Sequence, residues 1–259
     1  MALIKTKEEI KYLAEGGKLL SRALRAAMDA AVVGAKIEEL DSAARKIIAS
    51  GGGTPSFLGY KVHKLDMPFP TALCVSVNDE IVHGPANRHM VLKKGDLVGL
   101  DLGCWYEMLC TDMAATVCVG EVLDERHAEL LKYTRVALEK GIEQAKAGNR
   151  ILDISAAIER VANEHKFGIV RTLVGHGVGH EVHEEPHVPN FVDKRFDNMK
   201  LVPGMCLALE PMFTLGSGAV ETSDDGWTIR SSDSTMTAHF EATIAITKEG
   251  PKILTPIQS

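Results

Sequence analysis

The sequence lacks several features that would assign it to a particular class of protein. Its 259 residues contain no run of 18 apolar residues, which argues against a membrane-spanning helix. They contain no Cys-x-x-Cys pair, and the five cysteines mostly lie in apolar runs typical of buried free thiols. The formal net charge of -6 gives no basic excess of the kind that general nucleic-acid binders show. We therefore expect a protein of a reducing compartment, without a membrane span or a specific nucleic-acid partner.

The beginning of the chain favours a helix over a targeting segment. Thr6-Lys7-Glu8-Glu9 has the pattern of a capping box, whereas a signal peptide would need a basic segment followed by an apolar stretch. A hydrophobic content of 45% is sufficient for a substantial core, in one large domain or two modest ones.

Hydrophobic periodicity changes along the chain in a regular order. Apolar or small residues recur with helical spacing from residue 10 to Gly34, and again from 37 to 48 before three consecutive glycines. Short β-branched runs follow over 72–119, and helical spacing returns over 124–147 and 151–165 before further strand-like runs. The order is a helix pair, strands, a second helix pair and further strands.

Two short matches suggest an internal duplication. The segment that begins at Gly34 resembles the one that begins at Gly148, at an offset of 114. Gly95 lies six residues before Asp101, and Gly204 lies six residues before Glu210, at an offset of 109. We expect a single α/β domain over residues 1–259, with related halves over roughly 7–120 and 121–259 and a metal site between them.

Five side chains of the metal-ligand type occur in or beside apolar, strand-like runs. They are Asp101, Asp112, His176, Glu210 and Glu241. A charge in such a run is costly unless it is paired or bound to a cation. Four carboxylates and one imidazole would repel one another in a shared site, but they suit two divalent cations.

The first two carboxylates are eleven residues apart. A hairpin that turns at residues 105–108 would place Asp101 and Asp112 directly opposite, with Cβ atoms roughly 4.5 to 5.5 Å apart. Such a pair is destabilising without a cation between the carboxylates. The alternatives are solvated aspartates beside a turn and, for Glu210 and Glu241 taken singly, charges on edge strands.

His176 lies in a glycine-rich segment where backbone and ligand can approach closely. Three more histidines follow within eleven residues, a density typical of metal or catalytic sites. A mononuclear zinc motif, His-Glu-x-x-His, begins at His180 but fails because position 184 is Glu184.

These ligands, together with the segments 78–84 and 183–186, resemble those of the pita-bread metallopeptidases. Within that group the segments 74–80, 225–228 and 238–241 resemble type I methionine aminopeptidases, over nearly the whole chain. The resemblance implies an α/β (α+β) pita-bread fold. In that fold, two pseudo-symmetric halves, each with a helix pair and antiparallel strands, surround a central dinuclear metal site.

The resemblance also implies how the site is used. One divalent ion would be held by His176 and Glu210 and the other by Asp101, with Asp112 and Glu241 bridging both; Co, Mn, Fe and Zn all suit these ligands. A hydroxide bridging the two ions would hydrolyse the peptide bond. Glu210 would move the proton, and His83 and His183 would hydrogen-bond the scissile amide. The proposed walls of a methionine pocket are Tyr60, Cys74 and Trp227.

The implied activity is removal of the N-terminal methionine from nascent proteins and peptides, preferably before a small second residue. A cytoplasmic monomer that contacts the ribosome near the exit tunnel would fit that activity. Three features depart from the family pattern: His180 stands where arginine is more frequent, residues 175–186 equally resemble proline-directed peptidases, and Lys61–Pro70 resembles an insertion. The alternatives are therefore an Xaa-Pro aminopeptidase or dipeptidase and a non-catalytic pseudopeptidase that binds nascent chains, ribosomes or nucleic acid.

Overall fold

The computed structural model describes residues 3–61 and 67–257. Its helices form two packed pairs, as the periodicity predicts. They are α1 (Lys7–Ala30) with α2 (Ile37–Ser50), and α3 (Glu125–Gln144) with α4 (Ile151–His165). The predicted capping box begins α1, because the Thr6 hydroxyl accepts a hydrogen bond from the backbone N–H of Glu9 and the Glu9 carboxylate accepts one from the backbone N–H of Thr6.

An antiparallel, curved sheet connects the two helix pairs. Its strand order is β1-β4-β5-β14-β9-β7-β8, with β2 also paired to β4 and β15 to β14. The bounds are β1 (Thr54–Pro55), β2 (Leu73–Val77), β4 (Leu97–Tyr106), β5 (Leu109–Cys118), β7 (Gly175–Gly177), β8 (Glu184–Val188), β9 (Cys206–Leu209), β14 (Glu241–Thr247) and β15 (Gly250–Ile253).

Two smaller sheets lie beside the large one. The first has the order β13-β10-β6 and the second the order β11-β12-β3. Their bounds are β13 (Thr237–His239), β10 (Met212–Thr214), β6 (Gly168–Ile169), β11 (Val220–Thr222), β12 (Ile229–Ser231) and β3 (Glu80–Val82).

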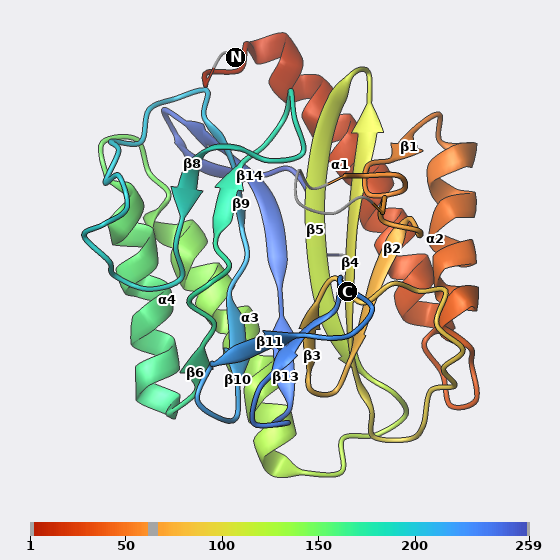
Figure 1. The fold of residues 1–259 in the computed structure, drawn as a ribbon. Helices are drawn as coiled ribbons and strands as arrows, with labels where there is room; N and C mark the ends of the chain where they lie inside the picture. Colours follow the sequence, from red (N-terminus) through yellow and green to blue (C-terminus); the bar gives the residue numbers. More distant parts are fainter. Residues whose placement is uncertain (1–2, 62–66, 258–259) are drawn as a thin grey trace.

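The helices cover one face of the large sheet. Figure 1 shows both pairs behind the strands, with α1 and α2 on the right and α3 and α4 on the left. Leu100 and Leu102 of β4 join the same buried cluster as Leu20 and Ile158 of the helices. Because side chains alternate along a strand, Asp101 between these two leucines points to the opposite face. The hydrophobic pattern thus selects the face on which the carboxylates gather.

Equivalent hydrogen bonds link each helix pair to the segment that precedes a strand of the large sheet, β4 in the first half and β9 in the second. The Gly34 N–H donates to the Leu92 carbonyl at 2.9 Å, and the Gly148 N–H donates to the Leu201 carbonyl at the same 2.9 Å. The two glycines have φ values of 88° and 100°, which only glycine adopts without strain. The two donors, Gly34 and Gly148, are 114 residues apart, and the two acceptors, Leu92 and Leu201, are 109 residues apart. These are the offsets of the two sequence matches that suggested an internal duplication.

The hairpin between β4 and β5 has a different register from the predicted one. Its two-residue turn is Glu107-Met108, both with positive φ, so Gly103 pairs with Asp112 and Asp101 pairs with Ala114. Asp101 and Asp112 are therefore diagonal neighbours, and the prediction that they lie directly opposite was wrong. The displacement is two residues, an even number, so both carboxylates still point to the same face.

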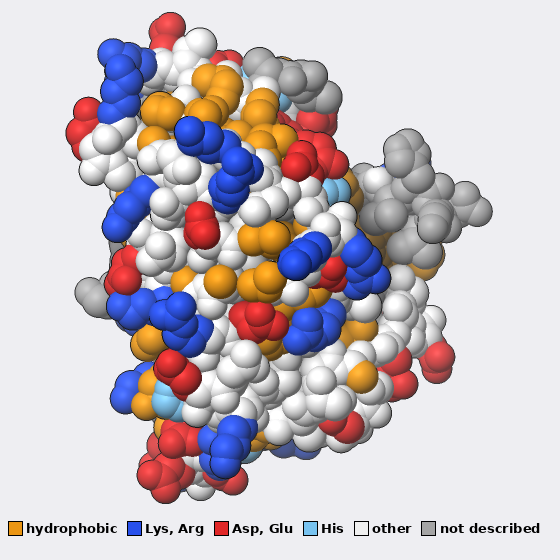
Figure 2. Space-filling view, turned by 90° about the vertical axis from the view of Figure 1, so that its left-hand side faces the viewer, with side chains coloured by type: hydrophobic (Ala, Val, Ile, Leu, Met, Phe, Trp, Pro, Cys, Tyr) orange, Lys and Arg blue, Asp and Glu red, His pale blue; other side chains and the backbone are white. Residues whose placement is uncertain are grey.

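The cysteine thiols are mostly buried. All five cysteines lie within the described residues and are free; only Cys118 is partly exposed. Among the described residues, no helix combines the length and apolar character needed to cross a membrane. On the face that carries α4, acidic and basic side chains are interspersed with apolar ones (Figure 2).

Candidate metal centre and substrate pocket

One row of paired residues crosses four strands of the large sheet and carries two of the predicted ligands. Cys74 of β2 pairs with Asp101 of β4, Asp101 pairs with Ala114 of β5, and Ala114 also pairs with Glu241 of β14. Paired residues of neighbouring strands point to the same face, so these side chains project together into the space away from the helices. The small Ala114 side chain leaves room between the two carboxylates.

The other two carboxylates flank this row. Asp112 lies two residues before Ala114 on β5 and so faces the same side. Its backbone N–H donates to the Thr243 hydroxyl at 2.9 Å, and that hydroxyl donates to the Asp112 carbonyl at 2.8 Å. Glu210 follows the last residue of β9, where Pro211 ends the strand pairing beside β14. Strand register, rather than sequence proximity, assembles the four acids.

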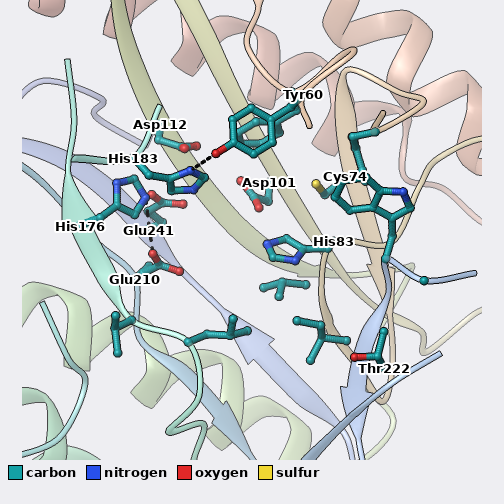
Figure 3. A pocket seen from close by; sticks show the side chains of 18 residues that line it. Tyr60, Cys74, His83, Asp101, Asp112, His176, His183, Glu210, Thr222 and Glu241 are labelled. Atoms are coloured by element: carbon teal, nitrogen blue, oxygen red, sulfur yellow. Dashed lines mark hydrogen bonds and ion pairs between the residues drawn. The ribbon is translucent and has the colours of Figure 1, made fainter. Parts of the chain in front are cut away.

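His176 enters the site from β7 in a fixed ring orientation. Its Nδ1 lies 2.8 Å from the carbonyl oxygen of Gly177, so Nδ1–H donates and Nε2 is left as an acceptor. That Nε2 lies 3.7 Å from Glu210 Oε1 (Figure 3). A Cβ added to Gly177 would lie 2.2 Å from the Glu185 carbonyl oxygen, so the backbone approach predicted for this segment requires glycine.

Donor atoms of Asp112, His176 and Glu241 all lie within 4.8 Å of one another. Asp101 and Glu210 line the same cavity. The structure therefore brings all five predicted ligands into one site.

Burial makes this set of acids unstable as free anions. Desolvation raises the pKa of Asp112 to about 7. Desolvation, and then the charges of neighbouring acids, raise the pKa values of Asp101, Glu210 and Glu241 well above the usual range. Desolvation lowers the pKa of His176 to about 3, which keeps the imidazole neutral and able to donate its lone pair.

Three of the acids also have buried oxygens without a partner. Within the described part of the chain, Asp101 Oδ1, Asp112 Oδ1 and Glu241 Oε1 accept no hydrogen bond. Buried polar atoms are normally satisfied, so these oxygens indicate a missing partner. Carboxylate oxygens beside a neutral imidazole are donors that divalent metal ions accept, and the residues fit such ions.

The five ligands line a cavity of about 450 Å³ together with His83 and His183. The Tyr60 hydroxyl lies 2.8 Å from His183 Nδ1 (Figure 3). Desolvation raises the pKa of Tyr60 above its ordinary value, so the phenol stays protonated. Tyr60, predicted as a pocket wall, therefore also contacts one of the two predicted catalytic histidines.

Aromatic side chains form the apolar end of the cavity. Cys74 and Trp227, both predicted, lie there with Phe57 and Phe69. The rings of Phe69 and Trp227 meet edge to face, with centroids 5.1 Å apart. Sequence reasoning missed both phenylalanines, although Phe69 lies within the predicted insertion Lys61–Pro70, of which residues 62–66 are outside the described part.

His83 has a strained backbone that neighbouring residues hold in place. Its φ is 62°, an uncommon value for a residue other than glycine. Arg88 donates to both oxygens of Glu80 and to the Val75 carbonyl at 2.7 Å, and the Glu80 carboxylate accepts from the Val77 N–H at 2.8 Å. These bonds tie the turn that carries His83 to β2. Arg88 was not predicted from the sequence, where its only indication was that it lies five residues after His83.

The loop that carries His183 is attached to the N-terminal segment. A buried ion pair joins Lys5 to Glu184, and the other Glu184 oxygen accepts from the backbone N–H groups of His180 and Glu181. His180 Nε2 lies 2.7 Å from the Glu9 carboxylate. The residue that departs from the family pattern therefore contacts α1 and lies outside the lining of the metal cavity.

One further histidine in the site was missed. His239, on β13, is 3% exposed, and its Nε2 lies 3.8 Å from Glu210 Oε2 and 3.9 Å from Glu241 Oε2. Its position two residues before Glu241 was the available signal, because two residues separate side chains of similar orientation in an extended chain.

A metal-dependent hydrolase is the class of protein that this fold and donor set define. The model of metallopeptidase family M24 matches residues 11–248, and the chain belongs to that family. It is 39% identical over 255 residues to a methionine aminopeptidase of Clostridium acetobutylicum, covering 98% of this chain and 99% of that protein.

Solved structures agree with this assignment. The crystal structure of methionine aminopeptidase from Thermotoga maritima is similar with a TM-score of 0.92 and 40% identity, covering 97% of this chain and 98% of that one. Prolidase from Pyrococcus furiosus has a TM-score of 0.79 at 24% identity, and the match covers 99% of this chain and 66% of that chain. The pita-bread fold expected from the sequence is confirmed.

Proposed function

We propose that this protein removes the N-terminal methionine from nascent proteins and peptides, preferably when the second residue is small. The main support is the cavity, in which the five candidate ligand side chains adjoin an apolar end formed by Cys74, Phe69 and Trp227. A thioether side chain suits such polarisable aromatic walls. Relatives named methionine aminopeptidase, about 40% identical over the full length, support the same activity.

We further propose that two divalent ions occupy the site. His176 and Glu210 would hold one ion, Asp101 the other, and Asp112 and Glu241 would bridge them; Co, Mn, Fe and Zn all suit these donors. When bound, the ions supply Lewis acidity toward the peptide carbonyl and lower the pKa of a water molecule. The unpartnered carboxylate oxygens support this assignment.

The chain's own residues have separate tasks in this proposal. Glu210 would accept a proton from water and deliver it to the leaving amine. Desolvation lowers the pKa of His83 to about 4 and also lowers that of His183, so both rings are neutral donors near pH 7. When the Tyr60 hydroxyl donates to His183 Nδ1, the Nε2–H of His183 is free to donate to the scissile amide.

Peptide turnover tests this proposal against proline-directed cleavage. Protein reconstituted separately with Co, Mn and Fe should release methionine from Met-Ala and Met-Gly peptides and leave Xaa-Pro peptides intact. Cleavage of Xaa-Pro peptides alone would contradict the methionine specificity. Two bound ions without turnover of either substrate would point to a pseudopeptidase that binds nascent chains.

The cellular setting follows from the same proposal. Five free cysteines suit a reducing compartment such as the cytoplasm. Action on nascent chains would place a monomer near the ribosomal exit tunnel. We also propose that residues 1–259 form one catalytic domain with halves over roughly 7–120 and 121–259, which the equivalent hydrogen bonds of Gly34 and Gly148 support.

A further inference from the structure

His239 is a buried imidazole that the proposed ligand set and mechanism do not use. It is 3% exposed, and its Nε2 has no hydrogen-bond partner in the described part of the chain. Burying a polar atom without a partner is unfavourable, so an unpartnered nitrogen beside two carboxylates indicates a partner within the site.

Backbone contacts fix the position of His239 in the fold. The His239 N–H donates to the Thr116 hydroxyl at 2.9 Å, and the same hydroxyl donates to the His239 carbonyl at 2.9 Å. On the other side, β13 pairs with β10, where His239 faces Met212. Held from both sides, the His239 backbone fixes the point from which the imidazole projects beside the carboxylates.

Two histidines flank the Glu210 carboxylate at nearly equal distances. His176 Nε2 lies 3.7 Å from Oε1, and His239 Nε2 lies 3.8 Å from Oε2. The two rings differ in their surroundings. His176 approaches Asp112 and Glu241 closely enough to share an ion with them, whereas His239 lies near the second oxygens of Glu210 and Glu241.

We propose that His239 is a positioning residue, whose Nε2–H donates a hydrogen bond to the Glu210 and Glu241 carboxylates and orients them toward the metal ions. The distances of 3.8 and 3.9 Å exceed a hydrogen bond by less than 1 Å, a shift that small side-chain rotations provide. Ligand carboxylates are commonly held by such outer hydrogen bonds, whose loss weakens metal binding about 10- to 100-fold.

This inference rests on the metal site of the proposed function, and Co(II) binding tests it without an activity assay. Metal-free wild type, H239L and H239Q are titrated with Co(II), and the dissociation constant and visible absorption spectrum are recorded. We expect H239L to bind about 10- to 100-fold more weakly with an altered spectrum. H239Q, which keeps a neutral N–H donor, should stay within about threefold of wild type.

His89 provides the control, because its side chain is fully exposed and H89L should leave Co(II) binding unchanged. Wild-type affinity in H239L, or equal loss in H239Q and H239L, would overturn the inference. Failure of wild type to bind Co(II) would instead overturn the metal site itself.

A measurement on wild type covers the case in which the variants do not fold. In protein with ¹⁵N-labelled histidine loaded with Zn(II), long-range proton–nitrogen spectra report the tautomer of each ring. A protonated Nε2 on His239 supports the proposed donor. An unprotonated Nε2 contradicts it, because the ring would then have no hydrogen to give to the carboxylates.

Discussion

Asp101 and Glu241 pair with the same residue, Ala114, from its two sides. The methyl group between them sets the space into which both carboxylates project. A larger side chain at this position would enter the volume where the proposed ions are held.

We therefore expect A114V to weaken Co(II) binding about 10- to 100-fold, because two extra methyl groups in a packed site cost about 1 to 3 kcal/mol. Isothermal titration with Co(II) measures this effect. A114G should bind as wild type does. A115V is the matched control, because Ala115 faces the helices and should change stability without changing metal affinity. Tight Co(II) binding by A114V would contradict this account of the site.

The hydrogen bond between Tyr60 and His183 predicts a catalytic effect of a single hydroxyl. Y60F should lower kcat about 5- to 10-fold on Met-Ala peptides, the equivalent of about 1 kcal/mol for one net hydrogen bond, with little change in KM. Steady-state kinetics measures both constants. Y133F, on the distant α3, should behave as wild type. If Y60F raises KM and leaves kcat intact, Tyr60 acts only as a pocket wall.

The Lys5–Glu184 pair predicts that the N-terminal segment stabilises the loop of His183. The Lys5 side chain is 1% exposed and the Glu184 side chain 8%, so K5M leaves a buried carboxylate unpaired and should cost about 3 to 5 kcal/mol of unfolding free energy. Urea unfolding of the metal-free protein measures the loss. The double variant K5M/E184Q should regain most of it.

The comparison for this pair is the exposed ion pair of Lys11 with Glu15, at 3.9 Å. K11M should change stability by less than about 0.5 kcal/mol. Equal losses in K5M and K11M would show that the buried pair has no special contribution.

The lowered pKa of His83 predicts that the stability of the folded protein depends on pH. Desolvation, and then the neighbouring His183, lower its pKa to about 4, below about 6.5 for an unfolded histidine. Between pH 6.5 and pH 4 the unfolded chain therefore binds a proton at His83 that the folded protein does not. The free energy of unfolding is unaffected by the titration of His83 above pH 6.5 and decreases as the pH falls toward 4. Between pH 7 and pH 5, metal-free wild type should lose about 1 to 2 kcal/mol more than H83Q, which cannot titrate.

Urea unfolding of both proteins at the two pH values provides the test. The same loss in H83Q and wild type would mean that His83 is protonated in the folded protein near pH 6.5. Burial would then not keep the ring neutral below pH 6.5.

The sequence predicted the elements, and the five side chains that line one cavity, well because local physics determines them. Helical spacing and the capping box set α1, and the glycines after α2 marked its end. Carboxylates inside apolar runs were recognisable as candidate ligands because burying them alone is costly. These signals come from residues that lie near one another in the chain.

The register between β4 and β5 could not be read in the same way. A turn at Glu107-Met108 uses two residues other than glycine at positive φ, so the sequence carries no strong turn signal there. The same limit applies to the contacts of His239 with Glu210, of Tyr60 with His183 and of Lys5 with Glu184, which join residues 29 to 179 positions apart in the chain.

The sequence by itself therefore determined the order of the elements, the pita-bread fold class and the five candidate ligand side chains that line one cavity. Only the tertiary structure decided which side chains of the site lie next to one another. Asp101 and Glu241 both pair with Ala114, the Tyr60 hydroxyl contacts His183, and His239 lies beside Glu210. The reason is physical. Periodicity and burial act on each segment separately. Distances between side chains depend instead on strand register and on packing between segments that lie far apart in the sequence.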